Sequence, residues 1–325
     1  MASAKGRSLG SDTPASADLG RILFMGSGTF AVPLLAAVAP RCADILVVTR
    51  PDRPAGRGLV ERSAPVAAWA HNAGLPTVEP RRQRLAEARE AVEHFAPDGL
   101  LLAAYGQLVP PDWLTLGERP PLNVHPSLLP RHRGADPVAG TILAGDAVGG
   151  VTLMIMVEAL DAGPIVGQWP VPLTGRENAP ELEAELAELA AQVVPPVLVQ
   201  WTTGSLQPIA QDDHQATLIR PFSRADGQID WSRSAVEIDR QVRALQPWPG
   251  AWTTLEDRRL HVRRAHPGTG VAEVPIGLVV PGDPPEVACG GGSLVLDEVQ
   301  PEGRGRMTGA DWRRGIPRQH VLLGG

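Results

Sequence analysis

Lysine is almost absent from this sequence: among 325 residues it occurs once, as Lys5. A Schiff-base lysine or a Walker-type phosphate loop needs a lysine in the folded part of a protein, and neither is available here. Cysteine is nearly as scarce. Cys42 and Cys289 lie far apart and lack CxxC spacing, so the sequence predicts neither a disulfide framework nor a thiolate zinc site.

Long apolar runs are also missing. Residues 1–20 are rich in Ser, Ala, Gly and Asp, and they lack the apolar stretch of ~7–15 residues that a secretory signal needs. No run elsewhere approaches the ~20 apolar residues of a membrane span. We therefore expect a soluble, cytoplasmic protein without a membrane partner, and a disordered extension over residues 1–20.

The net charge of −6 does not favour non-specific attraction to a phosphate backbone. This charge is unevenly distributed along the chain. Residues 220–325 contain 14 Lys/Arg and 13 Asp/Glu, whereas the residues before them contain 16 and 23. Any contact with nucleic acid must therefore come from local basic patches.

The length and the 43% hydrophobic content suffice for about two domains. From residue 21 to about 200, short apolar runs alternate with helical patterns, which is typical of a Rossmann-like α/β domain with a mostly parallel sheet. Strands are predicted at residues 21–25, 45–48, 100–104, 122–125 and 151–157. Helices are predicted at residues 31–39, 65–73, 84–95, 136–144 and 180–194.

A polar stretch follows Trp201 and is typical of a linker lying over the surface. The pattern after it changes to one helix and short strands separated by Gly/Pro turns, which predicts a small OB-like β-barrel. The helix is expected at 234–245 and the strands at 251–255, 260–264, 277–280 and 293–299. The predicted domain limits are 21–202, with a linker at 203–219, and 220–325.

The segment GSGTFA at residues 26–31 satisfies the G-x-G-x-x-A fingerprint of dinucleotide-binding folds. Such a site also needs an acid about 20 residues further on, at the end of the second strand. Here that strand ends in Thr49-Arg50-Pro51, which supplies no acid. The simpler interpretation is that the glycines permit a tight turn between a strand and a helix.

The segment NVHPSLLPRHR at residues 123–133 is the most informative part of the chain. Side chains alternate along a strand, so Asn123 and His125 should project from one face while Val124 faces the core. Pro126 cannot continue a central strand, which places the histidine at its carboxyl end, where ligands bind in open α/β sheets. A structural role for either residue alone remains open.

A carboxylate follows the next predicted strand, because Asp161 lies in the turn LDAG at residues 160–163. An Asp in such a turn often serves only to cap the backbone, and spacing does not show that it contacts His125. His125 and His132 lack a Cys or carboxylate companion at ligand spacing, so no metal site is predicted.

Taken together, NVHPSLLPRHR, LDAG and the loop PDRPAGRG at residues 51–58 resemble the folate-dependent formyltransferases, and within them the branch that acts on initiator methionyl-tRNA. The resemblance implies catalytic roles for Asn123, His125 and Asp161, with 10-formyltetrahydrofolate as co-substrate. It also implies folate contacts in the S-L-L-P segment. Residues 101–106, which end a central strand, are a further candidate for the pterin slot. The candidate folate-binding residues are Ser127, Leu128, Leu129, Pro130, Tyr105 and Gly106.

The acceptor depends on other features. The PDRPAGRG loop reaches toward the tRNA acceptor arm in that family, and residues 229–231, 247–249 and 299–307 resemble parts of its second domain. Arginines position phosphates, and the candidates for tRNA contact are Arg53, Arg57, Arg304 and Arg306. A monomer is expected. A formyltransferase for a sugar amine, a formyl-folate hydrolase and a non-catalytic RNA-binding module are the alternatives.

Two departures from the family pattern concern charge. The family's loop often continues with lysines where this chain has Leu59-Val60-Glu61, and Asp136 stands at a position that is usually small and uncharged. In the expected chemistry, Asn123 and an N–H of His125 donate hydrogen bonds to the formyl oxygen. Asp161 is expected to raise the pKa of His125 and to relay the amine proton.

Overall fold

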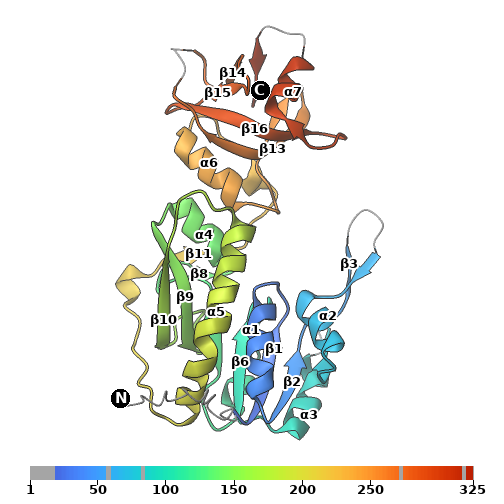
Figure 1. Ribbon diagram of the computed structural model, residues 1–325, viewed down its shortest axis with the longest axis vertical. Coiled ribbons are helices and arrows are strands. Elements are labelled where there is room, and N and C mark those ends of the chain that lie inside the picture. The colour runs from blue at the N-terminus through green and yellow to red at the C-terminus, as the bar shows by residue number, and fades with distance from the viewer. Residues whose placement is uncertain (1–18, 56–59, 82–84, 271–273, 317–319, 325) are drawn as a thin grey trace, which may run out of the picture.

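The computed structural model describes residues 19–55, 60–81, 85–270, 274–316 and 320–324. The expected amino-terminal extension, apart from Leu19 and Gly20, lies outside these ranges, as does Arg57. Figure 1 shows an α/β domain, coloured from blue to yellow-green, with a smaller and mainly β domain above it in orange and red. The predicted fold class, a Rossmann-like domain followed by a barrel-like one, is confirmed.

The first domain is built on a seven-stranded sheet. Its strands, in spatial order, are β10 (Ile165–Pro172), β9 (Val148–Ile155), β7 (Leu122–His125), β6 (Gly99–Ala103), β1 (Arg21–Gly26), β2 (Asp44–Val48) and β5 (Thr77–Val78). Neighbours from β7 to β5 are parallel, whereas β9 is antiparallel to both β7 and β10. The sheet is therefore mostly parallel, as predicted, with an antiparallel edge that the sequence did not indicate.

Both faces of this sheet are covered. Along β1, Phe24 packs in a core that includes α1 (Ala31–Val38) and α5 (Ala179–Thr202), while its neighbours Leu23 and Met25 pack in a second core with α3 (Leu85–Phe95). This alternation is what an apolar strand buried on both faces requires. Two further helices are α2 (Pro65–Asn72) and α4 (Pro137–Ala144).

Helix α5 is longer than predicted. The expected end at Val194 precedes Pro195 and Pro196, yet the helix continues to Thr202. Leu198 and Trp201 are buried beyond the prolines, so packing of the last turns against the domain offsets the lost backbone hydrogen bonds. None of the helices in the described ranges is long and apolar enough to cross a membrane.

The second domain is an antiparallel, barrel-like sheet with α6 (Ala235–Ala244) and α7 (Gly309–Arg314) beside it. Its strands, in spatial order, are β12 (Trp252–Leu255), β13 (Arg258–Pro267), β16 (Ser293–Pro301), β15 (Glu286–Ala288), β14 (Leu278–Val280) and β18 (Val321–Leu322), and β17 (Met307–Thr308) pairs with β16. A capping box between Ser234 and Glu237 begins α6. Helix α6 packs against both β13 and α4, so it connects the two domains.

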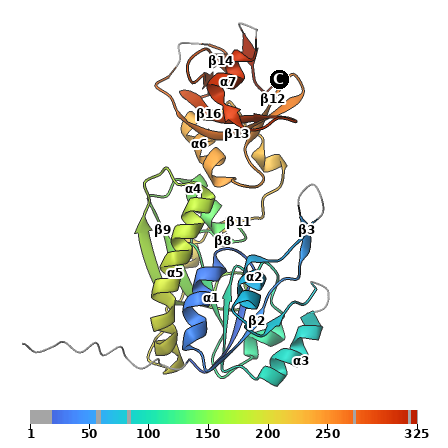
Figure 2. The same cartoon turned by 45° about the vertical axis from the view of Figure 1, so that its right-hand side comes forward.

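The PDRPAGRG sequence includes β3 (Arg53–Ala55), which pairs in an antiparallel hairpin with β4 (Val60–Arg62), just after that sequence. Figures 1 and 2 both show this hairpin projecting from the side of the first domain toward the level of the second. Arg53 is thus placed in β3.

Candidate active site

Asn123 and His125 lie on β7, near the middle of the sheet. Leu122 and Val124 belong to the core beneath α1 and α5, so Asn123 and His125 face the other side of the sheet, as strand alternation predicts. Both are nearly inaccessible, with exposed fractions of 8% and 4%. Two buried polar side chains on one face need partners, because an unpaired buried polar group is costly.

Asp161 supplies one of these partners. Its Oδ1 lies 3.4 Å from Asn123 Nδ2, and its Oδ2 lies 3.8 Å from His125 Nδ1. The backbone N–H of Gly134 donates to the same Oδ2 at 2.8 Å. The structure therefore brings together the three residues that the sequence could join only through resemblance.

The antiparallel edge explains how Asp161 reaches the other two residues. Ile155, the last residue of β9, pairs with Leu122, the first residue of β7. The chain therefore leaves β9 at the amino-terminal end of β7, away from His125. Residues 156–164 form a closed loop, because Ile155 N donates to Pro164 O at 2.9 Å. This loop folds back over the polar face of β7. Asp161 has a φ of +50°, a left-handed conformation that Asp tolerates better than most residues.

The protons on His125 can be assigned from its partners. His125 Nε2 lies 3.0 Å from the carbonyl oxygen of His132, and a carbonyl oxygen only accepts, so Nε2 carries a hydrogen. In the neutral ring, Nδ1 is then the free base and faces Asp161. The expected N–H donor of His125 is thus committed to a backbone carbonyl.

Burial lowers the pKa of His125 below its ordinary value, and the nearby Asp161 carboxylate and the His132 carbonyl offset only part of this effect. The sequence-based expectation that Asp161 raises the pKa of His125 has the right sign for that one interaction. Loss of hydration outweighs it, because the ring is almost completely buried.

His132 extends the network away from the sheet. Its Nε2 lies 2.7 Å from Asp146 Oδ2, and Asp146 also pairs with Arg131 at 2.6 Å. His132 N donates to Thr217 Oγ1 at 2.8 Å. The sequence predicts no role for His132, although it lies in the NVHPSLLPRHR segment, or for Asp146, which no motif marks.

The S-L-L-P segment forms a tight turn directly after His125. Ser127 Oγ donates to Arg131 O at 2.8 Å, and Leu129 N donates to Thr152 Oγ1 at 3.1 Å. Gln168 Nε2 donates to Leu129 O at 2.7 Å. Of the four candidates for folate binding in this segment, Ser127 and Leu129 are buried, whereas Leu128 and Pro130 are half-buried and more accessible to a ligand.

Tyr105 and Gly106 follow β6, next to β7 in the sheet. Tyr105 is buried, its Oη has no hydrogen-bond partner within the described part of the chain, and burial raises its pKa to about 12. The side chain of Gln107 also has no such partner. Unpaired buried polar atoms beside β7 are consistent with a ligand that hydrogen-bonds to this segment.

The glycine-rich turn after β1 does not offer a phosphate cradle. The N–H groups of Ser27 and Gly28 both donate to Ala104 O, at 3.2 and 3.1 Å. The Glu183 carboxylate accepts from Thr29 Oγ1 at 2.6 Å and from Phe30 N at 3.2 Å, so an acid already occupies the start of α1. The dinucleotide hypothesis is therefore unsupported, and the turn has a structural role.

The chain thus has a two-domain architecture, in which a mostly parallel α/β sheet with neighbouring Asn, His and Asp side chains is followed by a barrel-like domain. The description "Formyl transferase" matches residues 20–198, and "Formyl transferase, C-terminal domain" matches residues 221–317. The chain therefore belongs to the formyl transferase family and is a transferase of formyl groups.

Relatives of known name match almost the whole chain. A methionyl-tRNA formyltransferase of Anaeromyxobacter dehalogenans is 42% identical over 311 residues, covering 94% of this chain and 99% of the relative. One of Roseiflexus castenholzii is 42% identical over 308 residues, covering 91% of this chain and 96% of the relative.

Solved structures share the fold at low identity. HypX from Aquifex aeolicus, in complex with tetrahydrofolic acid, has a TM-score of 0.63 and 17% identity, covering 90% of this chain and 46% of that one. The sugar 3N-formyl transferase WlaRD also has a TM-score of 0.63, with 13% identity, covering 88% and 99%.

Proposed function

We propose that this enzyme transfers the formyl group of 10-formyltetrahydrofolate to the α-amino group of methionine on initiator tRNA. The observation that carries the proposal is the 42% identity to a methionyl-tRNA formyltransferase, which extends through the second domain over 94% of the chain. The donor is proposed from the NVHPSLLPRHR and LDAG motifs and from family membership.

In the proposed reaction, the amine nitrogen attacks the formyl carbon, and the formyl oxygen becomes an oxyanion. One amide hydrogen of Asn123 is directed at Asp161, which leaves the second for the oxyanion. One such donor stabilises the transition state by about 3–4 kcal/mol in comparable sites. The C–N10 bond then breaks, N10 of the folate takes up a proton, and the new amide is released.

The attacking amine must lose a proton in the same sequence. His125 Nδ1 and the Asp161 carboxylate face each other at 3.8 Å and form the proposed acceptor. Burial keeps the ring neutral at physiological pH by lowering the pKa of His125, so Nδ1 is available as a base. Asp161 stabilises the imidazolium that results.

This arrangement predicts an acid limb in the pH profile of kcat/KM, which reports the groups of the free enzyme. Because burial lowers the pKa of His125, the limb should lie on the acid side of the ordinary histidine range, where Nδ1 becomes protonated. Asp161→Asn removes the interaction that raises this pKa and should move the acid limb to still lower pH. It should also reduce kcat about 10²-fold or more. Steady-state kinetics from pH 5 to 9 test both effects, and an unmoved acid limb in Asp161→Asn would contradict the proposed pairing.

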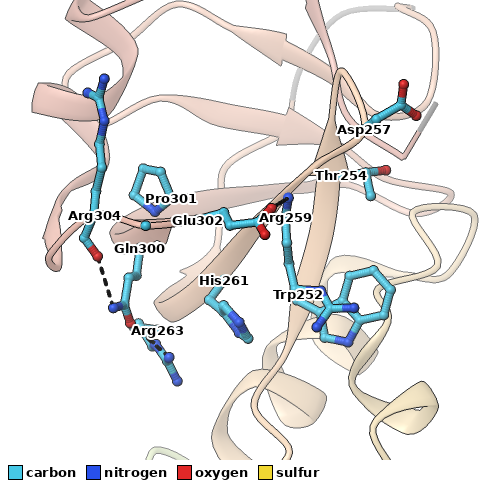
Figure 3. A pocket seen from close by; sticks show the side chains of 11 residues that line it. Trp252, Thr254, Asp257, Arg259, His261, Arg263, Gln300, Pro301, Glu302 and Arg304 are labelled. Carbon is cyan, nitrogen blue, oxygen red and sulfur yellow. Dashed lines mark hydrogen bonds between the residues drawn. The ribbon is translucent and has the colours of Figure 1, made fainter. Parts of the chain in front are cut away.

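The second domain offers a surface suited to RNA. Arg259, His261, Arg263 and Arg304 line a pocket of about 620 Å³ together with Trp252, and Arg259 lies over the Trp252 ring at 4.0 Å (Figure 3). Asp257 and Glu302 also line it, and the Glu302 carboxylate accepts from Arg259 N at 3.1 Å. Guanidinium groups beside an aromatic ring suit phosphate and base contacts.

The two arginines predicted from the end of the chain differ in placement. The Arg304 carbonyl accepts from Gln300 Nε2, while its guanidinium points away from His261 and Arg263 in Figure 3. Arg306 is exposed and pairs with Glu298 at 3.4 Å. We propose that six arginines contact tRNA phosphates: Arg53, Arg57, Arg259, Arg263, Arg304 and Arg306.

Arg57 provides the test of the loop. Arg57→Glu should raise the KM for tRNA several-fold, because a phosphate contact becomes a repulsion, with little change in the KM for folate. The effect should shrink as salt is raised. The charge-matched control is Arg176→Glu. Arg176 is exposed, belongs to the same domain and lies far from the loop in the sequence. Equal tRNA kinetics for the two variants would remove Arg57 from the interface.

The whole proposal is tested with the purified enzyme, 10-formyltetrahydrofolate and charged initiator tRNA. Uncharged tRNA and a nucleotide-linked sugar amine are run beside it. Formylmethionyl-tRNA should form, and neither control should be formylated. Formylation of the sugar amine, or release of formate without an acceptor, would favour the sugar-amine transferase or the hydrolase instead.

A further inference from the structure

The segment between the domains is paired with the active site at both ends. Residues 209–219, called here the interdomain segment, begin at Ile209, which exchanges two backbone hydrogen bonds with Ile165 at 2.7 and 2.8 Å. At the other end, β11 (Leu218–Ile219) pairs in parallel with β8 (Arg133–Gly134). The first contact lies just after residues 156–164, called here the Asp161 loop. The second lies at Gly134, whose N–H donates to the Asp161 carboxylate.

Gln211 lies between these two anchors and closes the Asp161 loop. Its Nε2 donates to Asp161 O at 2.8 Å and to Gly163 O at 2.7 Å. Its Oε1 accepts from Arg133 Nε at 3.1 Å and from Arg133 Nη2 at 2.8 Å. A guanidinium only donates and a carbonyl only accepts, so the orientation of the Gln211 amide is determined by its partners.

Arg133 connects this amide to the other side of the site. The residue precedes Gly134, whose N–H donates to Asp161 Oδ2, and its guanidinium also pairs with Asp213 at 2.7 Å. Gly134 has a φ of +112°, and a Cβ at this position would lie 2.3 Å from Ile219 O of the interdomain segment. The segment thus contacts the backbone on both sides of the Asp161 carboxylate.

We propose that Gln211 is a positioning residue for catalysis, which sets the distance between Asp161 and His125 by holding the carbonyls of residues 161 and 163. The inference rests on the proposed roles of Asp161 and His125. The left-handed backbone of Asp161 needs such support, because residues in sparsely populated conformations persist only where their surroundings hold them. A displacement near 1 Å can cost about 10²-fold in rate.

Two variants separate the functions of the amide. Gln211→Met keeps the side-chain length and removes both donors and the acceptor. Gln211→Glu keeps an acceptor for Arg133 and replaces the donors with an oxygen that repels the two carbonyls. Gln215→Met is the matched control, because Gln215 lies in the same segment, is exposed, and donates to Asp212 at 2.8 Å.

Both Gln211 variants should lower kcat about 10- to 100-fold, with the KM for folate and for tRNA within about two-fold of the parent enzyme. Gln215→Met should leave all three constants unchanged. If both Gln211 variants match Gln215→Met, the proposal is overturned. It is also overturned if kcat falls only together with rising KM values and a lower melting temperature, because the role is then structural alone.

A second readout does not depend on the reaction. Among the residues that the structure describes, Asp161 and His132 are the titratable side chains whose charges bear on His125, and of these two Asp161 favours the protonated ring. Imidazole NMR of the full-length protein should therefore show His125 titrating at lower pH in Gln211→Met than in the parent. Unchanged titration would overturn the proposal. If the parent enzyme does not formylate methionyl-tRNA but the titration of His125 still shifts in Gln211→Met, the proposed acceptor is overturned. Gln211 then remains a positioning residue.

Discussion

His125→Ala should reduce kcat by about 10²- to 10⁴-fold, because it removes the proposed base from the reaction. The affinity for tRNA should stay within about two-fold of the parent value, since the ring is 4% exposed and its contacts are internal. Single-turnover formylation and filter binding of charged tRNA measure the two quantities separately.

The control for this variant is His94→Ala, an exposed histidine on α3. It should retain full activity. His125→Gln provides a second test, because it keeps a polar side chain in the buried site and lacks a base. Retained formyl transfer in either His125 variant would remove the histidine from the mechanism. Transfer by the parent enzyme, lost in the variants while RNA binding is retained, would exclude a non-catalytic RNA-binding module.

Among substitutions that add a single methyl group near the site, Gly163→Ala should destabilise the fold most. A Cβ on Gly163 would lie 1.8 Å from Ile155 O and 2.9 Å from Ile155 C, both of which are backbone atoms of the central sheet. Neither can move aside as a flexible side chain would. We expect the free energy of unfolding to fall by about 3 kcal/mol or more, at the upper end of overpacking effects. Urea denaturation followed by circular dichroism measures this change.

Gly305→Ala is the comparison for Gly163→Ala. A Cβ at Gly305 would meet no atom within 4 Å, so its effect should stay within about 0.5 kcal/mol. Equal urea midpoints for the two variants would show that the loop after β9 adapts more easily than its packing indicates. Gly163→Ala should also lose activity in the folded fraction, because the same loop holds Asp161.

Much of the scaffold could be predicted because it follows periodic patterns. The alternation around Val124 placed Asn123 and His125 on one face of β7, and the structure bears this out. The course of the chain after β9 could not be predicted in this way. An apolar strand has the same pattern whether it pairs in parallel or antiparallel, and only the pairing of Ile155 with Leu122 explains how Asp161 folds back over the site.

The interdomain segment shows a second limit. Its composition is that of a solvated linker, and Gln211 has no periodic neighbours that would mark it. Its importance comes from partners far away in the sequence, Asp161, Gly163 and Arg133. Likewise, the predicted helix ended at Val194 although α5 continues through Pro195 and Pro196, because local propensity does not include the burial of Trp201.

The pairing of β11 with β8 has a consequence for hybrid enzymes. Exchange of second domains between relatives at residue 203, where the composition changes, would also exchange the residues that hold Asp161. The parental segment would stay with its own catalytic domain only if the junction followed Ile219. Recombination points within residues 209–219 should therefore be poorly tolerated, although the sequence there has the composition of a linker.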